Sequence, residues 1–242
     1  MKLPISKRLL CCASLVPQGA RVADVGCDHG YLSIHLLREH IAATAAAMDL
    51  RPEPLEAARR NAARFQTADR MEFFLCDGLS AQGPGVVDTV VCAGMGGDTM
   101  VKILSECSWA NDPAVTWILQ PQSSGNDLRR WLSERGYRIE REKLVQDGGF
   151  LYAVMEVHYG GGVPLTPGQQ YVSPQLLEED PALVRAYIER VKNALIRAVD
   201  GLSRAKEDGL AERRAYYETA LRQVRELEED YENRQRIGTG VV

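Results

Sequence analysis

Residues 21–32 read Arg21-Val22-Ala23-Asp24-Val25-Gly26-Cys27-Asp28-His29-Gly30-Tyr31-Leu32, and this stretch decides the fold. An apolar run is interrupted by glycines and then resumes with helical spacing. This pattern predicts a strand, a tight turn and the start of a helix, which is where an open α/β sheet binds a nucleotide-like ligand. Gly26 and Gly30 would let the backbone approach a ligand at points where a Cβ atom would collide.

Two acidic residues in this stretch indicate the kind of ligand. Asp24 ends the predicted strand and Asp28 lies in the turn. Two carboxylates would repel a pyrophosphate and would favour a ligand end that carries an ammonium group. The spacing also differs from G-x-G-x-x-G, which argues against a nicotinamide oxidoreductase. We therefore expect S-adenosylmethionine as the cofactor, because its amino-acid end is zwitterionic. The alternative is a glycine-rich turn with two solvated acids.

Composition narrows the class of protein. The chain has 242 residues and 45% hydrophobic content, enough for one sizeable core and an appendage. Its net charge of −4 does not indicate a nucleic-acid binder, although a local basic patch is compatible with that total. The sequence has no apolar run of membrane-spanning length and no signal-peptide pattern, so we expect a cytoplasmic protein without a membrane partner. The cysteines and histidines lack metal-ligand spacing, so we expect no metal, and no obligate protein partner is evident.

Apolar runs and turn signals predict five strand–helix units and a closing hairpin. The expected strands are 21–25, 42–48, 71–76, 86–93 and 115–119, the expected helices are 5–15, 30–40, 52–62, 98–106 and 125–135, and the hairpin pairs 137–145 with 151–157. This order predicts an α/β fold with a Rossmann-like methyltransferase sheet, mostly parallel and with the last strand antiparallel. Cys76 and Cys92 are expected inside buried strands as small apolar residues.

The C-terminal third follows a different pattern. Residues 160–164 are rich in glycine and read as a linker, which divides the chain into a cofactor-binding domain, 1–160, and a helical domain, 161–242. Apolar residues in 184–202 and in 217–231 recur at alternating spacings of four and three. Because Asp208-Gly209 lies between these two sets, the pattern predicts an antiparallel, coiled-coil-like helical hairpin.

Acidic residues also end the next two predicted strands. Ligands of an open parallel sheet lie over the carboxyl ends of its strands. Asp49 could accept hydrogen bonds from both hydroxyls of a ribose, because a carboxylate has two acceptor oxygens. Asp77 could accept from an adenine amino group, with the amide of Gly78 facing a ring nitrogen. His29 could contact cofactor or substrate, or only cap the helix that follows.

The fourth strand end points to the methyl acceptor. Gly94-Met95-Gly96-Gly97 offers backbone N–H groups, room and one flexible apolar side chain. The sequence has no Asn/Asp-Pro-Pro-Tyr there, the motif expected for methylation of an exocyclic amine, and no cysteine placed as a nucleophile for pyrimidine C5. Tyr31 could form a wall of the pocket. The alternative is ordinary packing, with Met95 and Tyr31 as core residues.

Four segments together closely resemble the bacterial TrmK family of tRNA (adenine(22)-N(1))-methyltransferases. They are Asp24-Val25-Gly26-Cys27-Asp28-His29-Gly30-Tyr31-Leu32, Asp77-Gly78-Leu79, Ala93-Gly94-Met95-Gly96-Gly97 and Ile118-Leu119-Gln120-Pro121. The resemblance covers nearly the whole chain and implies a class I methyltransferase that uses S-adenosylmethionine to methylate N1 of an adenine in the D-loop region of tRNA. It also implies that Gln120 and Pro121 lie on the substrate side. Cys27, Gly30 and Gln122 depart from the residues expected in many relatives.

This chemistry does not need a strong base. Adenine N1 carries a lone pair and can attack the methyl group in line, so the main task is to position two reactants. The product ring is cationic, and Asp28 is the candidate catalytic residue that would stabilise the developing charge, unless it only holds the cofactor. The target base must first be exposed, and Met95 or Tyr31 could then stack on it.

The helical domain is the candidate tRNA-binding element. Basic residues on its predicted polar face are Arg185, Lys192 and Arg213-Arg214. The alternative is a solvated hairpin that only supports the other domain. For the whole chain, the alternatives are a methyltransferase with another substrate and a noncatalytic RNA-binding protein with a vestigial cofactor fold.

Overall fold

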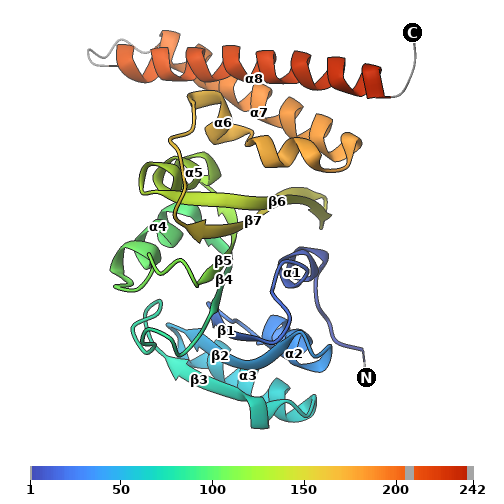
Figure 1. Cartoon of the computed structure of the whole chain (residues 1–242), viewed down its shortest axis with the longest axis vertical. Helices are drawn as coiled ribbons and strands as arrows, with labels where there is room; N and C mark the ends of the chain where they lie inside the picture. The colour runs from blue at the N-terminus through green and yellow to red at the C-terminus, as the bar shows by residue number, and fades with distance from the viewer. Residues whose placement is uncertain (1, 205–209, 239–242) are drawn as a thin grey trace.

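The computed structural model describes residues 2–204 and 210–238, and its spine is a seven-stranded sheet with the order β3-β2-β1-β4-β5-β7-β6 (Figure 1). The strands are β1 (Ala20–Val25), β2 (Ala42–Asp49), β3 (Met71–Leu75), β4 (Thr89–Gly96), β5 (Thr116–Ser123), β6 (Tyr137–Asp147) and β7 (Phe150–Tyr159). β1 to β5 are parallel, and β7 runs antiparallel to both β5 and β6. The predicted mostly parallel sheet with an antiparallel strand in its closing hairpin is therefore confirmed.

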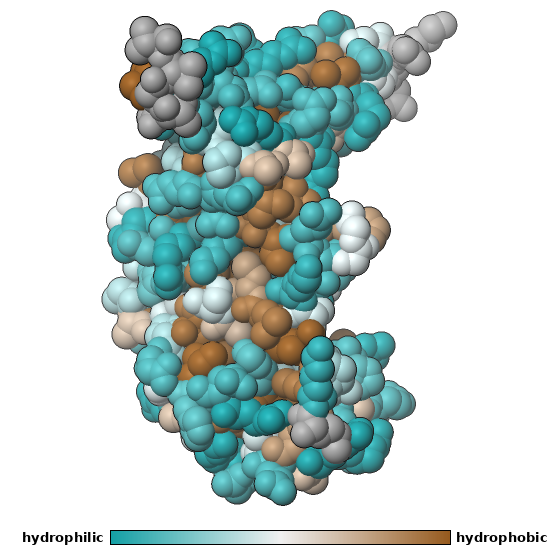
Figure 2. Space-filling view, turned by 90° about the vertical axis from the view of Figure 1, so that its right-hand side faces the viewer, coloured by the Kyte–Doolittle hydropathy of each residue, from teal (hydrophilic) through white to brown (hydrophobic). Residues whose placement is uncertain are grey.

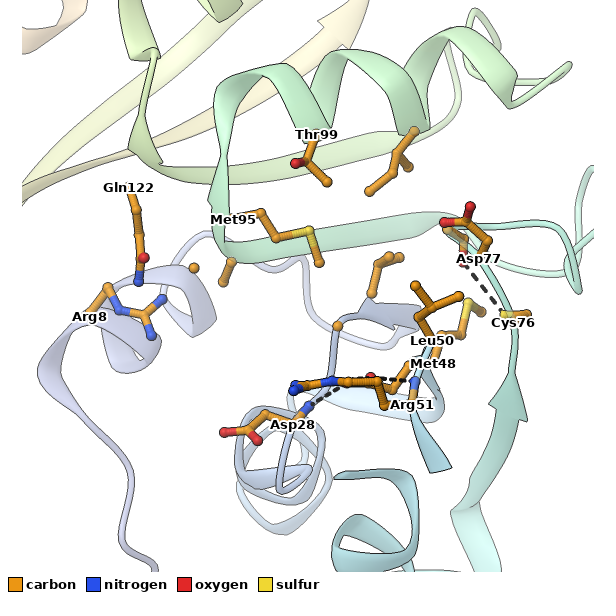
Figure 3. Close-up of a pocket in the computed structure, with 17 residues that line it drawn as sticks. Arg8, Asp28, Met48, Leu50, Arg51, Cys76, Asp77, Met95, Thr99 and Gln122 are labelled. Atoms are coloured by element: carbon orange, nitrogen blue, oxygen red, sulfur yellow. Dashed lines mark hydrogen bonds and ion pairs between the residues drawn. The ribbon is translucent and has the colours of Figure 1, made fainter. Parts of the chain in front are cut away.

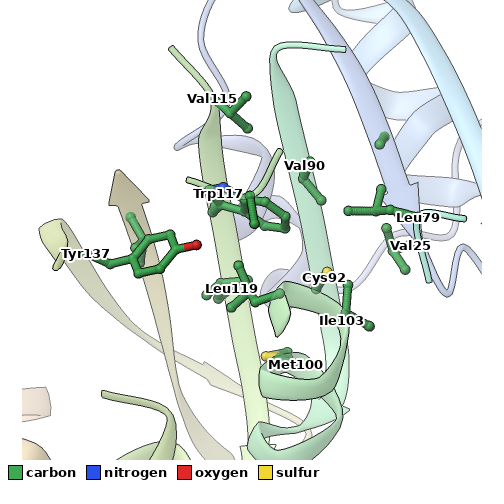
Figure 4. Close-up of a cluster of buried hydrophobic side chains, with 14 of the residues drawn as sticks. Val25, Leu79, Val90, Cys92, Met100, Ile103, Val115, Trp117, Leu119 and Tyr137 are labelled. Atoms are coloured by element: carbon green, nitrogen blue, oxygen red, sulfur yellow. The ribbon is translucent and has the colours of Figure 1, made fainter. Parts of the chain in front are cut away.

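The strands of this sheet are buried on both sides, because helices cover both of its faces. One face packs against α1 (Lys7–Ala13), α2 (Tyr31–Arg38) and α3 (Pro52–Arg64), which the short 3₁₀ helix η1 (Ala68–Arg70) follows. The other face packs against α4 (Gly97–Glu106) and α5 (Gly125–Glu134). Figure 4 shows this second core, in which Leu119 of β5 lies near Met100 of α4 and Trp117 lies beside Val90 of β4.

The start of β4 and the end of β3 differ from the predicted strands. Val86 belongs to an exposed turn, and β4 begins only at Thr89. The strand then continues through Gly96, with register shifts around Met95, so the predicted glycine turn is the irregular end of a strand. Cys76 follows β3 instead of lying inside it and is only half-buried. The predicted buried position is correct for Cys92.

The helical region consists of α6 (Pro167–Tyr171), the 3₁₀ helix η2 (Pro174–Glu178), α7 (Pro181–Arg204) and α8 (Ala211–Gly238). Ion pairs join Arg185 to Glu232 at 2.7 Å and Lys192 to Glu228 at 2.7 Å. Because residue numbers rise along α7 as they fall along α8, the two helices are antiparallel, as predicted. The predicted turn at Asp208-Gly209 lies outside the described residues.

The helical region and the sheet share a hydrophobic cluster. Leu144 of β6 and Ala153 of β7 pack in it with α7 residues such as Ile188 and α8 residues such as Val224. A polar contact adds to this packing, since the Leu144 backbone N–H donates to a Glu179 carboxylate oxygen at 3.1 Å. The predicted boundary near residue 160 is thus crossed by a common core.

A buried ion pair reinforces the same junction. The guanidinium of Arg129 on α5 donates to both carboxylate oxygens of Glu142 on β6, and neither side chain is more than 2% exposed. Arg129 also donates to the Gln170 carbonyl oxygen and to the Tyr187 hydroxyl, each at 3.1 Å. The hydroxyl of Ser173 donates to Glu142 as well. These contacts connect the sheet and α5 to the helical region at Gln170, Ser173 and Tyr187.

Candidate functional site

A cavity of about 560 Å³ lies at the carboxyl ends of β1 to β4, in the size range of small-molecule sites. It is elongated, with Asp77 at one end and Gln122 and Arg8 at the other (Figure 3). Its lining is Arg8, Val25, Gly26, Asp28, Met48, Asp49, Leu50, Arg51, Cys76, Asp77, Gly78, Ala93, Gly94, Met95, Thr99, Ile103 and Gln122. The strand-end acids Asp49 and Asp77 are therefore brought together as predicted.

The two glycines of the β1–α2 turn serve different purposes. Gly26 lines the cavity with a φ of +72°, and a Cβ atom there would collide with the Met95 methyl group. Gly30 does not line the cavity. A Cβ atom on Gly30 would lie 2.9 Å from the Ala58 side chain, so this glycine permits close packing of α2 against α3. The predicted ligand approach therefore fits Gly26, and Gly30 serves helix packing.

Asp24 is turned into the protein and does not line the cavity. Its carboxylate accepts a hydrogen bond from the Ser33 hydroxyl at 2.7 Å and is only 4% exposed. Burial raises the pKa of Asp24 to about 6, and the Ser33 hydrogen bond opposes that rise. A contact between Asp24 and the cofactor stays a prediction.

Asp28 is the most open acid of the turn. The residue lines the cavity with a backbone φ of +50°, and 69% of its side chain is exposed. His29 lies 3.7 Å from the Asp28 carboxylate and its ring stacks on Tyr31 at 5.6 Å. Neither His29 nor Tyr31 lines the cavity. Their predicted contacts with cofactor and substrate stay predictions.

The end of the cavity near β2 and β3 has a buried acid beside an exposed one. Asp49 is 7% exposed and accepts hydrogen bonds from the backbone N–H groups of Arg51 at 3.0 Å and Asp28 at 3.4 Å. Asp77 is exposed and forms an ion pair with Lys102 at 2.8 Å. The adjacent Gly78 has a φ of +54°. The Asp77 carboxylate is thus partly neutralised by a lysine that the sequence did not indicate.

At the opposite end, Gln120 holds two cavity residues in place. Its Oε1 accepts from the Gly94 backbone N–H at 3.0 Å and from Arg8 Nη1 at 2.5 Å. Its Nε2 donates to the Pro121 carbonyl oxygen at 2.9 Å, and the side chain is fully buried. Gln120 itself does not line the cavity, so it positions Arg8 and Gly94.

Gly96, Gly97 and Pro121 also lie outside the cavity lining. A Cβ atom on Gly96 would lie 3.1 Å from the Ser123 hydroxyl, and one on Gly97 would collide with the Ser124 carbonyl oxygen. These two glycines let the end of β4 and the start of α4 approach the end of β5. Their substrate role, and that of Pro121, stay predictions, whereas Met95 and Gly94 do line the cavity.

A second cavity of about 430 Å³ lies between the end of β5, β7 and α7. Its lining includes Gln122, Tyr152, Tyr187 and Arg190, and Gln122 also lines the first cavity. The Arg8 guanidinium lies 5.9 Å from the centre of the Tyr152 ring. The two cavities thus meet at Gln122. Figure 2 shows hydrophobic residues gathered in the middle of one face, between the helical region at the top and the β1–β3 region at the bottom.

Sequence pattern alone did not indicate a role for four polar residues of this lining, Arg8, Arg51, Thr99 and Gln122. Arg8 lies in the first helix, 112 residues from its partner Gln120, and no local signal connects them. Arg51 lies two residues after Asp49, just beyond the second predicted strand. Thr99 lies in the first turn of α4 and Gln122 near the end of β5, where substrate-facing residues are expected.

Within residues 2–204 and 210–238, no group of three or more histidine, cysteine or acidic side chains could hold a metal ion. No helix in this described part is long and apolar enough to cross a membrane.

Comparisons with known proteins agree with this geometry. A family model described as a methyltransferase domain matches residues 5–155. The tRNA (adenine(22)-N(1))-methyltransferase of Bacillus subtilis (strain 168) is 30% identical over 188 residues, 75% of this chain and 79% of that protein. A crystal structure of a putative tRNA (m1A22) methyltransferase of Streptococcus pneumoniae is 31% identical, with a TM-score of 0.76 over 91% of this chain and 99% of that one. The same protein in complex with S-adenosyl-L-methionine gives 28% identity and a TM-score of 0.75, over 92% and 98% of the two chains.

Proposed function

The chain belongs to the tRNA (adenine(22)-N(1))-methyltransferase family, and we propose that it transfers a methyl group from S-adenosylmethionine to N1 of adenine 22 in tRNA. The observation that carries this proposal is the elongated cavity, which has two acids at one end and open polar groups beside Met95 at the other. A site of this shape holds a nucleoside cofactor across β1 to β3 and leaves the ends of β4 and β5 for a second reactant. Since tRNA is the substrate, we place the activity in the cytoplasm.

The lining fits S-adenosylmethionine. Asp49 would accept hydrogen bonds from the ribose hydroxyls, and Asp77 with Gly78 would face the adenine ring. Asp28 would attract the ammonium group of the amino-acid end, and Arg8 would attract its carboxylate. A Cβ atom on Gly94 would lie 3.2 Å from Arg8 Nη1, so only a glycine leaves this space open. Each role is assigned to a residue that lines the cavity.

The bound cofactor supplies an activated methyl group, and the protein supplies position and charge. The adenine N1 lone pair forms the new N–CH₃ bond while the S–CH₃ bond breaks and its electron pair stays on sulfur. No proton leaves N1, so the site needs no strong base. Positive charge moves from the sulfonium to the adenine ring, and the exposed Asp28 carboxylate would stabilise it there. Met95 would pack against the face of the base.

The second cavity and the helical region are proposed to hold the rest of the tRNA. Three of the basic residues that the sequence suggested form ion pairs with nearby acids: Arg185 with Glu232, Lys192 with Glu228, and Arg214 with Glu218. Arg190 forms no ion pair in the described chain and lines the second cavity next to Tyr187. We therefore assign phosphate contacts to the neighbourhood of Arg190 rather than to the paired residues.

A methylation assay tests the function. The purified protein, S-adenosylmethionine and an unmodified tRNA transcript should yield 1-methyladenosine at position 22, mapped by mass spectrometry of nuclease fragments. A transcript with guanosine at position 22 is the matched control and should remain unmethylated. Methylation of that control, or of another position, would assign a different substrate. Cofactor binding without any methylation of tRNA would favour a noncatalytic role.

A further inference from the structure

We infer that the Gln122 side-chain amide reads the edge of the target adenine formed by N6 and N7, and so selects adenine over guanine. This inference rests on the proposed function, because it concerns the base whose N1 is methylated. Gln122 lies where the two cavities meet, at the end of the site away from Asp77 (Figure 3). A base that enters from the second cavity toward the cofactor site has to pass this side chain.

The amide of Gln122 is available for a ligand. It makes no hydrogen bond to any residue of the described chain, and its Nε2 lies 3.6 Å from the point where a Gly94 Cβ atom would be. Gln120, two positions earlier on the same strand, uses both of its amide atoms in hydrogen bonds to Arg8, Gly94 and Pro121. Two chemically identical side chains therefore have different tasks, one inside the protein and one at the cavity.

Gln122 lies near the end of β5, where the strand is held by β4 alone. β5 pairs with β4 up to Ser123, and Trp117 to Leu119 pair with β7. The register shifts there, from Pro121 opposite Met95 to Ser123 opposite Gly96, so Gln122 has no partner on β4. Its direction is seen directly: its Nε2 lies near Gly94, and Figure 3 shows the side chain pointing toward Arg8. The Gln122 amide thus lies beside Gly94 at the cavity, where it can meet a base.

The reaction limits which edge of the base can be recognised. N1 must point at the methyl group, so the edge that contains N1 is committed to the chemistry. The remaining polar edge of adenine carries the N6 amino donor and the N7 acceptor, which one glutamine amide can contact together. Guanine offers two acceptors, O6 and N7, on that edge. The Gln122 Oε1 atom would then face an acceptor without a hydrogen between them, which disfavours guanine.

Replacing atoms on both partners tests this contact. The value of kcat/KM is measured for wild type and for Gln122→Leu on two tRNAs. One carries adenosine at position 22, and the other carries 7-deazaadenosine there, which lacks the N7 acceptor. Gln122→Leu should lower kcat/KM on adenosine about 10- to 100-fold, the scale of a lost bidentate base contact. The 7-deaza substitution should slow wild type but should slow Gln122→Leu no further, because the partner of N7 is already gone.

Two further variants separate this role from a structural one. Gln122→Asn keeps the amide on a shorter stem and should retain more activity than Gln122→Leu. Gln146→Leu makes the same chemical change at an exposed β6 position outside both cavities, and it should match wild type on both tRNAs. S-adenosylmethionine affinity by calorimetry should remain within about twofold for all three, which shows an intact cofactor site.

The outcomes are distinct. If wild type produces 1-methyladenosine at position 22 and the 7-deaza effect is the same in Gln122→Leu as in wild type, the assignment of Gln122 is wrong and the proposed function stands. If wild type produces no 1-methyladenosine there, the proposed function is overturned and the assignment of Gln122 falls with it.

Discussion

The cavity at the carboxyl ends of β1 to β4 and the junction between the sheet and the helical region differ in how their polar side chains are paired. At the junction, Arg129 and Glu142 are fully buried, and their hydrogen-bonding atoms are used by each other and by Tyr187 and Ser173. In the cavity, Asp28 is exposed, and the amide of Gln122 has no partner in the described chain. The cavity lies at the carboxyl ends of β1 to β4, whereas the junction lies against β6.

The difference shows how a polar side chain can be assigned to stability or to function. A buried polar group costs free energy unless it is hydrogen-bonded, so a saturated network such as the junction serves the fold. An exposed polar group at a cavity needs no protein partner and remains free for a ligand. Gln120 and Gln122 show both cases within one strand. Removing polar groups should therefore have its largest stability effect at the junction.

Breaking the junction should have the largest effect. Glu142→Ala leaves the Arg129 charge buried without a counter-ion, so the free energy of unfolding should fall by about 3–5 kcal/mol. Urea unfolding followed by circular dichroism measures it. Glu140→Ala is the control, because the Glu140–Arg138 pair is about half exposed and contributes at most about 1 kcal/mol. Equal effects of the two substitutions would show that the buried network does not hold the junction.

Asp24 provides a second test, because its carboxylate is buried and hydrogen-bonded to Ser33 although it lies close to the open cavity. Its pKa is raised to about 6 by burial, so the native state binds a proton more tightly than the unfolded state. Stability from this group is therefore fully present below about pH 4 and is lost as the pH rises through 6. Between pH 4 and pH 6, the free energy of unfolding of wild type should fall by about 3 kcal/mol more than that of Asp24→Asn. Urea unfolding of both proteins from pH 4 to pH 7 tests this, and parallel curves would contradict it.

The smallest expected effect concerns basic residues of α7. Arg190→Gln should weaken tRNA binding modestly and should make the plot of log affinity against log salt shallower by about 0.9, the loss of one phosphate contact. Arg185→Gln should leave that slope unchanged, because Glu232 already neutralises Arg185. Fluorescence anisotropy at several salt concentrations measures both slopes. A larger change of this slope for Arg185→Gln than for Arg190→Gln would show that tRNA binds to the outer face of the hairpin instead.

Strand order made part of the cavity lining predictable from sequence. Asp49, Asp77 and Gly94 lie at or just beyond the carboxyl ends of parallel strands, which share one edge of a sheet, and all three line the cavity. The direction of a side chain was not predictable in the same way. Asp24 ends β1 like its counterparts, but Ser33 on α2 draws its carboxylate inward. That hydrogen bond depends on how α2 packs.

Contacts between distant segments were also beyond a reading of local pattern. Arg8 reaches the cavity only because α1 folds against the sheet beside Gln120. The helical hairpin was predicted from its apolar spacing, and the antiparallel arrangement is confirmed by ion pairs between α7 and α8. The pairing of the charges on its polar face could not be predicted, because net charge does not say which acid lies next to each basic residue.

The hydrogen bond from the Leu144 backbone to Glu179 bears on whether another copy of this chain can add a strand to the sheet. β6 is the last strand of the sheet, and an open last strand is a template onto which a strand of another molecule can add. Glu179 occupies a donor of that edge, and η2 and α7 pack over the same strand. At the other edge, β3 has only five residues, and Arg59 lies over its Phe73 ring at 4.6 Å. The helical region thus also protects the enzyme from aggregation, whatever it contributes to binding RNA.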